Sequence, residues 1–396
     1  MKHIRLICAS LFVLAIILKL SFFKYEYTDY IWFLKPWVEY IQEHGYFDAL
    51  KDPFHNYTMP YIYVLLFIAK LKLSATGTLF VIKIISIIFE YIAAYYIGRL
   101  VYMVKKDKMM IWLSLAIIPL LPTVILNSSY QTQCDSIYAA FAIASVYYVL
   151  NDRKILSMVL LGIAFSLKIQ TAMVLPFFFV YMLRGNIKWY YFSIIPLIYI
   201  ITALPAWIAG RPMFDLLIIY AKQSVYNSEI VGNFPNFYKL FGFLFQEKKY
   251  LGTMLMALIT LAGGWMLKSK KIVFDTELWL RLLFLSTIIC PYFLPGMLER
   301  YMYLGDICAV LYILAFRKKI YLPIGVIFVS FYSYIRSLHR FTYSEEIKET
   351  FSFFEFIPWE VVSVFFSGIV ILAIIDFYKQ LRNNNLNQDK LEHNIA

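Results

Sequence analysis

Long hydrophobic segments, separated by short polar ones, make up most of this chain. Many approach the ~20 residues that a helix needs to cross a bilayer, and several are shorter, so their ends are approximate. The pattern predicts an all-α, polytopic membrane protein with about twelve transmembrane helices in a single domain, 1–396. The segments cover residues 6–23, 79–104, 109–126, 137–150, 155–167, 171–183, 189–208, 250–267, 278–294, 301–316, 320–335 and 359–375.

Composition supports this prediction. The 396 residues are 61% hydrophobic and only 16% charged, with a mean hydropathy of +0.67, which is unlike ordinary soluble domains. The net charge of +12 does not indicate nucleic-acid binding, because the Lys and Arg residues lie in short runs and form no contiguous basic face. The four cysteines offer neither a disulfide framework nor a zinc-binding spacing.

The basic runs predict the topology, because cytoplasmic loops carry an excess of Lys and Arg. All the runs fall inside if segment 61–71 dips into the outer leaflet without crossing. Both termini are then cytoplasmic, the first segment is a retained helix rather than a signal peptide, and 379–396 is a loosely ordered tail. The basic runs are 105–108, 152–154, 184–188, 268–271 and 317–319, and the long outer loops are 24–77, 210–249 and 336–358.

Acidic residues stand at the predicted outer ends of several spans: Asp29, Asp135 and Glu299, which Arg300 follows. Charges at a membrane boundary are costly and commonly serve a site, so these loops predict one pocket on the outer face. Simpler explanations stay open. Asp29 could be a solvated boundary residue, Asp135 a helix cap together with Ser136, and Glu299-Arg300 an ion pair within a turn.

Other polar side chains in the outer loops extend this candidate pocket. Asn127 and Gln133 stand beside Asp135 and suit sugar hydroxyls. Lys168 either snorkels to lipid headgroups or binds a phosphate. Arg300 offers the planar guanidinium that suits phosphate oxygens, and Arg211 is a second outer cation.

Two further patterns concern the helices themselves. Pro36 could start a helix whose apolar face includes Trp37, so the first outer loop predicts an interfacial helix that lies on the bilayer. Lys83 and Glu90 share one face of the span 79–104. They could pair indirectly with each other, or with residues of other helices.

Short motifs follow one another between about residues 29 and 306, and in this order they resemble GT-C glycosyltransferases. The likeness is greatest to bacterial homologues of the mannosyltransferase that adds the second mannose to GPI anchors. Three positions depart from that pattern: Glu90 replaces an Asp, Tyr130-Gln131-Thr132 replaces the residues usual before Asp135, and Leu298 replaces a His. The motifs are Asp29-Tyr30 with Phe33-Leu34 and Pro36-Trp37, Asn56-Tyr57-Thr58-Met59-Pro60-Tyr61, 82–90, 122–128, 133–138, 162–170, Pro205-Ala206 with Ala209-Gly210-Arg211-Pro212, and Leu294-Pro295-Gly296-Met297-Leu298-Glu299-Arg300-Tyr301.

The resemblance implies a GT-C-like bundle and a hexosyltransferase that uses a polyprenyl-phosphate-sugar donor, with mannose favoured. It implies inverting transfer to a lipid-linked or cell-envelope glycan acceptor on the outer face of a bacterial inner membrane. Residues 1–316 would form the catalytic helices and loops, and 317–378 the C-terminal helices. Asp29 would be the base and Asp135 would orient the acceptor, or both would bind Mg²⁺ or Mn²⁺ if a metal is used. The implied substrate-binding residues are Tyr30, Trp37, Asn56, Tyr57, Asn127, Gln133, Lys168, Gln170, Arg211, Glu299, Arg300 and Tyr301.

Two alternatives use the same features. A transporter or flippase of lipid-linked sugars also needs acids, cations and an aromatic groove, but it places them near the bilayer midplane, commonly within inverted repeats. The polar clusters here concentrate on one predicted side, and the chain shows no clear repeat. An envelope polysaccharide polymerase or ligase is the third hypothesis, which changes the acceptor and keeps the enzyme.

Overall fold

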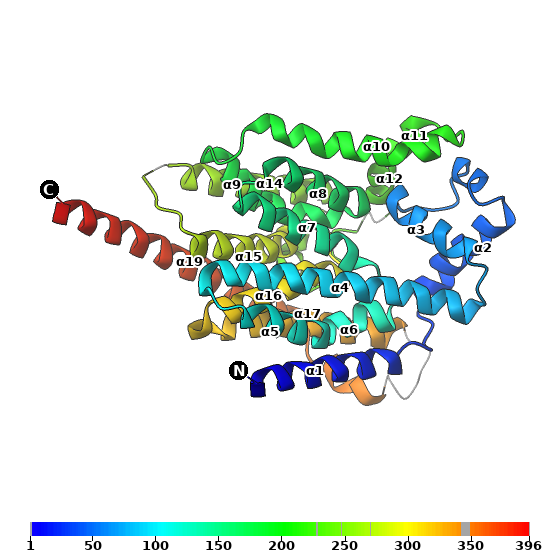
Figure 1. The fold of residues 1–396 in the computed structure, drawn as a ribbon, viewed down its shortest axis with the longest axis horizontal. Coiled ribbons are helices and arrows are strands. Elements are labelled where there is room, and N and C mark those ends of the chain that lie inside the picture. Colours follow the sequence, from blue (N-terminus) through cyan, green and yellow to red (C-terminus); the bar gives the residue numbers. More distant parts are fainter. Residues whose placement is uncertain (1, 227–228, 247, 270, 342–348, 396) are drawn as a thin grey trace. The chain divides into compact units, whose positions relative to one another are not determined.

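The computed structural model describes residues 2–226, 229–246, 248–269, 271–341 and 349–395, and all regular secondary structure in them is helical (Figure 1). Part of the predicted outer loop 336–358, residues 342–348, therefore lies outside the described chain. The helices form two compact units, which are described separately. Unit 1 comprises Met1–Tyr96, Trp112–Thr171 and Tyr190–Ser228, and unit 2 comprises Ile97–Ile111, Ala172–Trp189 and Glu229–Ala396.

Unit 1 contains most of the helices that precede residue 229. Within it, α8 packs between α7 and α10 (Figure 1). Gly162 permits the close approach of α8 and α10, because a Cβ at this position would lie 2.8 Å from Cβ of Ile198. The helices are α1 (Lys2–Ser21), α2 (Lys35–Glu43), α3 (Met59–Lys70), α6 (Pro122–Ile125), α7 (Asp135–Leu150), α8 (Lys154–Leu167), α10 (Ile194–Ile208), α11 (Met213–Leu217) and α12 (Ile219–Tyr226), with short turns η1 (Tyr30–Leu34), η2 (Asp48–Lys51), η3 (Ile118–Leu120) and η4 (Leu126–Tyr130).

Unit 2 is built around α15, which contacts α9, α14, α16 and α19. Its elements are α9 (Leu175–Leu183), α13 (Phe237–Phe241), η7 (Gly242–Phe245), α14 (Lys249–Leu267), α15 (Thr276–Phe293), η8 (Glu299–Met302), α16 (Tyr303–Ala315), η9 (Arg317–Lys319), α17 (Tyr321–Phe341), η10 (Ser352–Phe356) and α19 (Trp359–Ile395). Four elements divide their residues between the units: α4 (Ala75–Lys105), α5 (Met109–Ile117), η5 (Ile169–Val174) and η6 (Trp189–Ser193).

Seven helices of the described chain are long and apolar enough to cross a membrane, or eight if a pair bent by 59° between Leu120 and Pro122 counts as one span. A polytopic membrane protein is therefore supported, and the count of about twelve stays a prediction. The remaining expected spans correspond to shorter helices. For example, α8 has 14 residues, or about 21 Å, against the ~30 Å of a hydrocarbon core.

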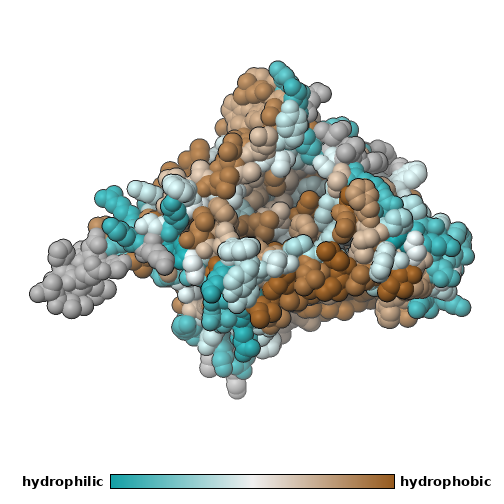
Figure 2. All heavy atoms as spheres, turned by 90° about the horizontal axis from the view of Figure 1, so that it is seen from above, coloured by the Kyte–Doolittle hydropathy of each residue, from teal (hydrophilic) through white to brown (hydrophobic). Residues whose placement is uncertain are grey.

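Helices with exposed hydrophobic faces agree with a lipid environment. On α14, Met254, Leu258, Leu261 and Trp265 are each more than half exposed, and their spacing places them on one face of the helix. Figure 2 shows hydrophobic side chains over broad areas of the surface that it draws. Extended hydrophobic patches are costly to expose to water, so this surface is typical of a protein that contacts lipid tails.

A polar stripe on α4 connects the elements of unit 1. Lys83 donates hydrogen bonds to the carbonyls of Phe22, Phe23 and Tyr25 at 2.8–3.0 Å, which caps the chain just beyond the end of α1. Ser86, one turn beyond Lys83 on α4, donates to the carbonyl of Gln133 in the loop before α7. Glu90, about one turn beyond Ser86, pairs with Lys19 of α1. Of the two interpretations open from the sequence, pairing with other elements is therefore confirmed.

The ion pair between Lys19 and Glu90 is almost completely buried, with a nitrogen–oxygen distance of 2.8 Å and side-chain exposures of 1% and 0%. Lys19 also donates to the hydroxyl of Ser128 at 3.4 Å. Removing one member of such a pair leaves an uncompensated charge in an apolar surrounding. The pair therefore fixes α1 against α4 and against the turn η4.

Two expectations for the C-terminal half are corrected. Segment 379–396 is not a loose tail up to Ile395, because α19 continues through it. The outer loop expected to begin at residue 336 is helical at first, since α17 extends to Phe341. In both cases hydrophobic periodicity ends before the helix does, because polar residues can extend a helix beyond its apolar part.

We predict that Lys83→Met lowers the free energy of unfolding of the detergent-solubilised protein by several kcal/mol, and its melting temperature with it. Hydrogen bonds from a charged donor contribute about 1.5–3 kcal/mol each, and three carbonyls lose their partner together. Lys70→Met is the matched control, because Lys70 is exposed at the end of α3. Equal melting temperatures for the two variants would contradict the capping role of Lys83.

Candidate functional site

The carboxylate of Asp135 is fully buried at the first residue of α7, and both of its oxygens accept hydrogen bonds. Lys168 donates to Oδ1 at 2.7 Å and Asn127 donates to Oδ2 at 2.8 Å. The ammonium of Lys168 is therefore neutralised in the interior and does not snorkel to headgroups. Asp135 bonds to side chains from other elements, so it is an ion-pair partner and not merely a cap for its own helix.

The carboxylate of Asp29 is in a different environment. Asp29 precedes the π-helical turn η1, and its side chain is half-buried rather than enclosed. Its Oδ2 accepts a hydrogen bond of 2.6 Å from the amide nitrogen of Gln133. Asp29 is thus oriented by a neutral donor and stays partly exposed.

The loop of residues 131–134 joins the groups that hold the two carboxylates. The backbone N–H of Gln133 donates to the carbonyl of Asn127 at 2.9 Å, so the side chain that holds Asp29 and the side chain that holds Asp135 belong to one local structure. Ser86 of α4 donates to the carbonyl of Gln133 at 2.8 Å, and Ser136 donates back to the carbonyl of Ser86 at 2.7 Å. The polar stripe of α4 therefore fixes this loop.

Unusual backbone geometry marks the same loop. Thr132 has φ 58°, in the left-handed region that a β-branched residue rarely adopts. Its hydroxyl is buried and has no hydrogen-bond partner among the described residues. A π-helical turn precedes the loop, η4 from Leu126 to Tyr130, as the π-helical turn η1 follows Asp29. Such features accumulate at functional sites, where the surrounding structure stabilises them.

Lys168 also borders an aromatic cluster. Its ammonium lies 5.4 Å from the centroid of the Tyr57 ring, and Tyr57 packs edge-on against Trp37 at 5.3 Å. Thr58, next in sequence, donates to the carbonyl of Leu167 at 3.2 Å. The first long loop is therefore attached to the end of α8, where Lys168 begins the next segment.

A second buried cation, Arg211, is held by His55. The guanidinium donates to Nε2 of His55 at 2.8 Å, and Nδ1 of His55 lies 2.7 Å from the carbonyl of Tyr57. Since a carbonyl only accepts, the proton is on Nδ1 and the imidazole is neutral. Burial and the neighbouring Arg211 lower the pKa of His55 to about 3. The Nε–H of Arg211 is buried without a hydrogen-bond partner in the described part of the chain.

The chain matches no protein-family model and no curated protein.

Other residues predicted for the site lie in varied places. Tyr30 is fully buried and donates to the carbonyl of Ala75 at 3.1 Å, and burial raises its pKa to about 12. Asn56 is exposed, and its carbonyl accepts from Gln223 at 2.5 Å. Gln170 is half-buried on η5. None of these three shares a hydrogen bond with either carboxylate.

Three further predicted residues belong to unit 2 and are described there. Glu299, Arg300 and Tyr301 form the start of η8. Glu299 is buried, and its carboxylate lies 3.5 Å from the guanidinium of Arg300. This pair matches the simpler interpretation from the sequence, an ion pair within a turn.

The donor set does not fit a divalent cation at Asp135. Both oxygens accept N–H hydrogen bonds, and a metal would have to displace the ammonium of Lys168. In the described residues no group of three or more His, Cys, Asp or Glu side chains is close enough to hold a metal ion. No step of the chemistry below is therefore assigned to Mg²⁺ or Mn²⁺.

Sequence reasoning did not select His55, Lys19 or Thr132. His55 lies beside Asn56-Tyr57, which were selected, but its partner Arg211 is 156 residues away. Lys19 and Ser128 are 109 residues apart; Ser128 ends the motif 122–128, and Lys19 is part of no motif. An indirect indication in the sequence existed only for Thr132. It lies in the segment 130–132, where this chain departs from the residues that the resembling family usually has before Asp135.

We predict that Asp135→Asn destabilises the protein by about 3 kcal/mol or more, because it leaves the buried ammonium of Lys168 without a counter-charge. The double variant Asp135→Asn/Lys168→Met removes both charges and should recover much of the loss. Thermal unfolding of the wild type, both single variants and the double variant in one detergent gives the coupling free energy. Additive effects would contradict the ion pair.

We predict that His55 makes the protein less stable at acidic pH. The unfolded state takes up a proton near pH 6.5, whereas the folded state does so only near pH 3. Stability is therefore lost as pH falls through this window, by about 2 kcal/mol at pH 5. His55→Gln should flatten the dependence of the melting temperature on pH between 7.5 and 5. The exposed His44, changed to Gln, is the control, and identical pH profiles for both variants would contradict the prediction.

Proposed function

We propose that this chain is a multi-pass membrane glycosyltransferase with a GT-C-like bundle of about twelve crossings. It transfers a hexose, with mannose favoured, from a polyprenyl-phosphate-sugar to a lipid-linked or cell-envelope glycan acceptor. Both termini lie in the cytoplasm of a bacterial cell, and the reaction takes place on the outer face of the cytoplasmic membrane. The ordered motifs suggest the family, and the polar network around Asp29 supports the chemistry.

The observation that carries the proposal is the difference between the two acids. Asp135 is buried and neutralised by Lys168, which suits a structural ion pair. Asp29 is half-buried and the amide of Gln133 orients its carboxylate, which suits a group that accepts a proton. A general base needs both placement and access. Asp29 meets both requirements, and Asp135 meets only the first.

In the proposed reaction Asp29 accepts the proton of the acceptor hydroxyl. The hydroxyl oxygen attacks the anomeric carbon from the side opposite the phosphate, so the configuration inverts. A new glycosidic C–O bond forms while the bond between the anomeric carbon and the phosphate oxygen breaks. Polyprenyl phosphate leaves with the electron pair of that bond. The proton taken up by Asp29 later returns to water.

The roles of the neighbouring residues follow from their contacts. Asn127 and Gln133 hold the two carboxylates, so they are positioning residues rather than contacts for sugar hydroxyls. The ammonium of Lys168 is paired with Asp135, so we do not assign the leaving phosphate to it. Arg211 has a buried Nε–H without a partner in the described chain, and its planar guanidinium suits phosphate oxygens. We assign the leaving phosphate to Arg211.

A transfer assay with purified protein tests the proposal. A panel of polyprenyl-phosphate sugars is offered with membrane-extracted acceptors, and release of polyprenyl phosphate is measured. Asp29→Asn should lower turnover by roughly 10²–10⁴, the usual contribution of a placed base, while affinity for the donor changes little.

Asp48→Asn is the matched control, because Asp48 is an exposed acid in the same loop and should behave as wild type. Near-normal turnover of Asp29→Asn would remove Asp29 as the base. Transport of a lipid-linked sugar across vesicles without any transfer would favour the flippase hypothesis instead.

A further inference from the structure

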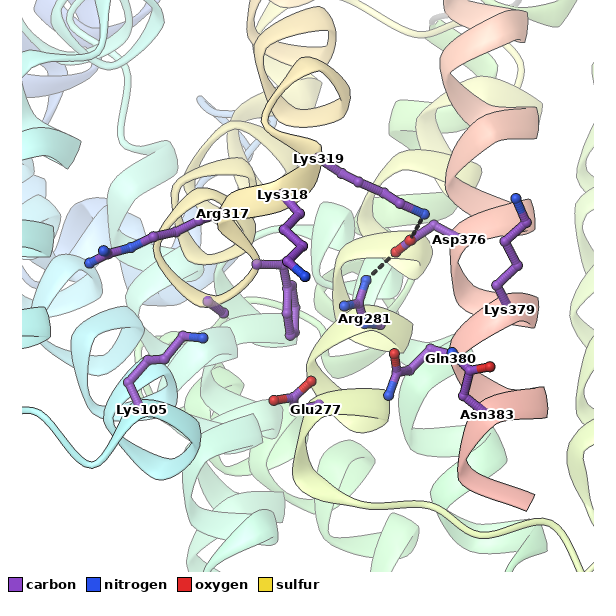
Figure 3. Close-up of a pocket in the computed structure, with 12 residues that line it drawn as sticks. Lys105, Glu277, Arg281, Arg317, Lys318, Lys319, Asp376, Lys379, Gln380 and Asn383 are labelled. Carbon is purple, nitrogen blue, oxygen red and sulfur yellow. Dashed lines mark hydrogen bonds and ion pairs between the residues drawn. The ribbon is translucent and has the colours of Figure 1, made fainter. Parts of the chain in front are cut away.

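Unit 2 contains a strongly basic pocket that the proposed reaction does not use. The cavity has a volume of 580 Å³, within the usual range for small-molecule sites. Two acids, Glu277 and Asp376, line it together with six cationic side chains (Figure 3): Lys105, Arg281, Arg317, Lys318, Lys319 and Lys379. No residue of the network around Asp29 and Asp135 contributes to it.

One of the two acids is already neutralised. Asp376 is paired with Arg281 and with Lys319, and it also accepts a hydrogen bond from Tyr312. The side chains of Asp376 and Arg281 are largely buried, with exposures of 7% and 11%. Figure 3 shows this cluster on one side of the pocket. It forms a fixed wall in which two cations share one carboxylate.

The other side of the pocket has an excess of positive charge. In Figure 3, Lys105, Arg317 and Lys318 lie there, with Glu277 below Lys318. Like charges that converge on one cavity repel each other unless an anion enters it. The positive-inside rule explains why cytoplasmic loops carry basic residues. It does not explain why basic residues from loops far apart in sequence line the same cavity.

The wall also offers further N–H donors. Gln380 and Asn383 of α19 line the cavity with their side-chain amides, and the amide nitrogen of Gln380 also donates to Asn384 at 3.0 Å. The Nε–H of Arg281 is buried and has no hydrogen-bond partner in the described chain. Cations combined with N–H donors match the oxygens of a phosphate group.

The pocket lies where candidate spans end. Lys105 is the last residue of α4, Glu277 is in the first turn of α15, and Lys319 stands just before α17. The ends of apolar spans lie at the level of lipid headgroups, where basic pockets between helices bind anionic headgroups. Lys105 and Lys318 also come from two basic runs that were both predicted to be cytoplasmic, so their convergence agrees with that topology.

We propose that this pocket binds a phosphate-bearing anion, either the headgroup of an anionic lipid or a soluble phosphate compound. Lys105, Lys318 and Lys379 supply the attraction, and the cluster of Arg281, Lys319 and Asp376 fixes the shape of the wall. Glu277 weakens the site, because its carboxylate is the acid not engaged by that cluster.

Two probes separate the sources of the phosphate. Pyrophosphate is titrated into the purified full-length protein in detergent, and phosphatidic acid is offered in phosphatidylcholine nanodiscs, with retained lipid counted by native mass spectrometry. Each lysine removed should weaken binding about five-fold, so Lys105→Gln/Lys318→Gln should lose more than ten-fold. Lys268→Gln/Lys271→Gln is the matched control, because it removes the same charge from another basic run of unit 2 that does not line the pocket.

A variant that binds more tightly separates the test from folding defects, because a misfolded protein would lose affinity and not gain it. Glu277→Gln removes a repulsive charge and should strengthen binding of the same probe about five-fold. Binding of pyrophosphate supports a soluble ligand, and retention of phosphatidic acid alone supports a lipid. Binding of neither probe, equal losses in the control variant, or no gain in Glu277→Gln would overturn the proposal.

Discussion

The polar stripe on α4 is the constraint on which the rest of unit 1 depends. Lys83, Ser86 and Glu90 follow one another at helical spacing on an otherwise hydrophobic helix, and each binds a different part of the chain. Lys83 caps the backbone beyond α1, Ser86 binds the loop before α7, and Glu90 pairs with Lys19. In an apolar surrounding none of these groups can exchange its partner for water, so the arrangement is enforced by the cost of breaking it.

The contacts of this polar stripe determine the different environments of the carboxylates of Asp29 and Asp135. The backbone that Lys83 caps leads directly to Asp29, and the loop that Ser86 binds leads directly to Asp135. Gln133 links the two by bonding to Asp29 through its side chain and to Asn127 through its backbone. In this local structure Asp135 is buried against Lys168, and Asp29 stays half-buried. In the proposed reaction this difference separates Asp135, which stabilises the structure, from Asp29, which accepts the proton.

Hydrophobic periodicity predicts the long helices well and the polar partners poorly. The span expected at 79–104 is α4, Ala75–Lys105, and the apolar run 61–71 lies in α3, Met59–Lys70, except for its last residue. Asp135 and Lys168 are 33 residues apart, and His55 and Arg211 are 156 residues apart, so no local spacing could reveal either pair. The end of α19 was missed because a polar helix has no hydrophobic signal. The motif order selected Asp29, Asp135 and Lys168, but only the contacts show that two of them neutralise each other.

The most direct test of the central claim is an experimental structure with a non-transferable polyprenyl-phosphate-sugar analogue bound. We expect the anomeric carbon to lie beside Asp29, with room between them for the hydroxyl of an acceptor, and the phosphate to contact Arg211. Asp135 should keep its ion pair with Lys168 in the complex. A sugar bound away from Asp29, or a complex in which Asp135 leaves Lys168 to approach the anomeric carbon, would contradict the account.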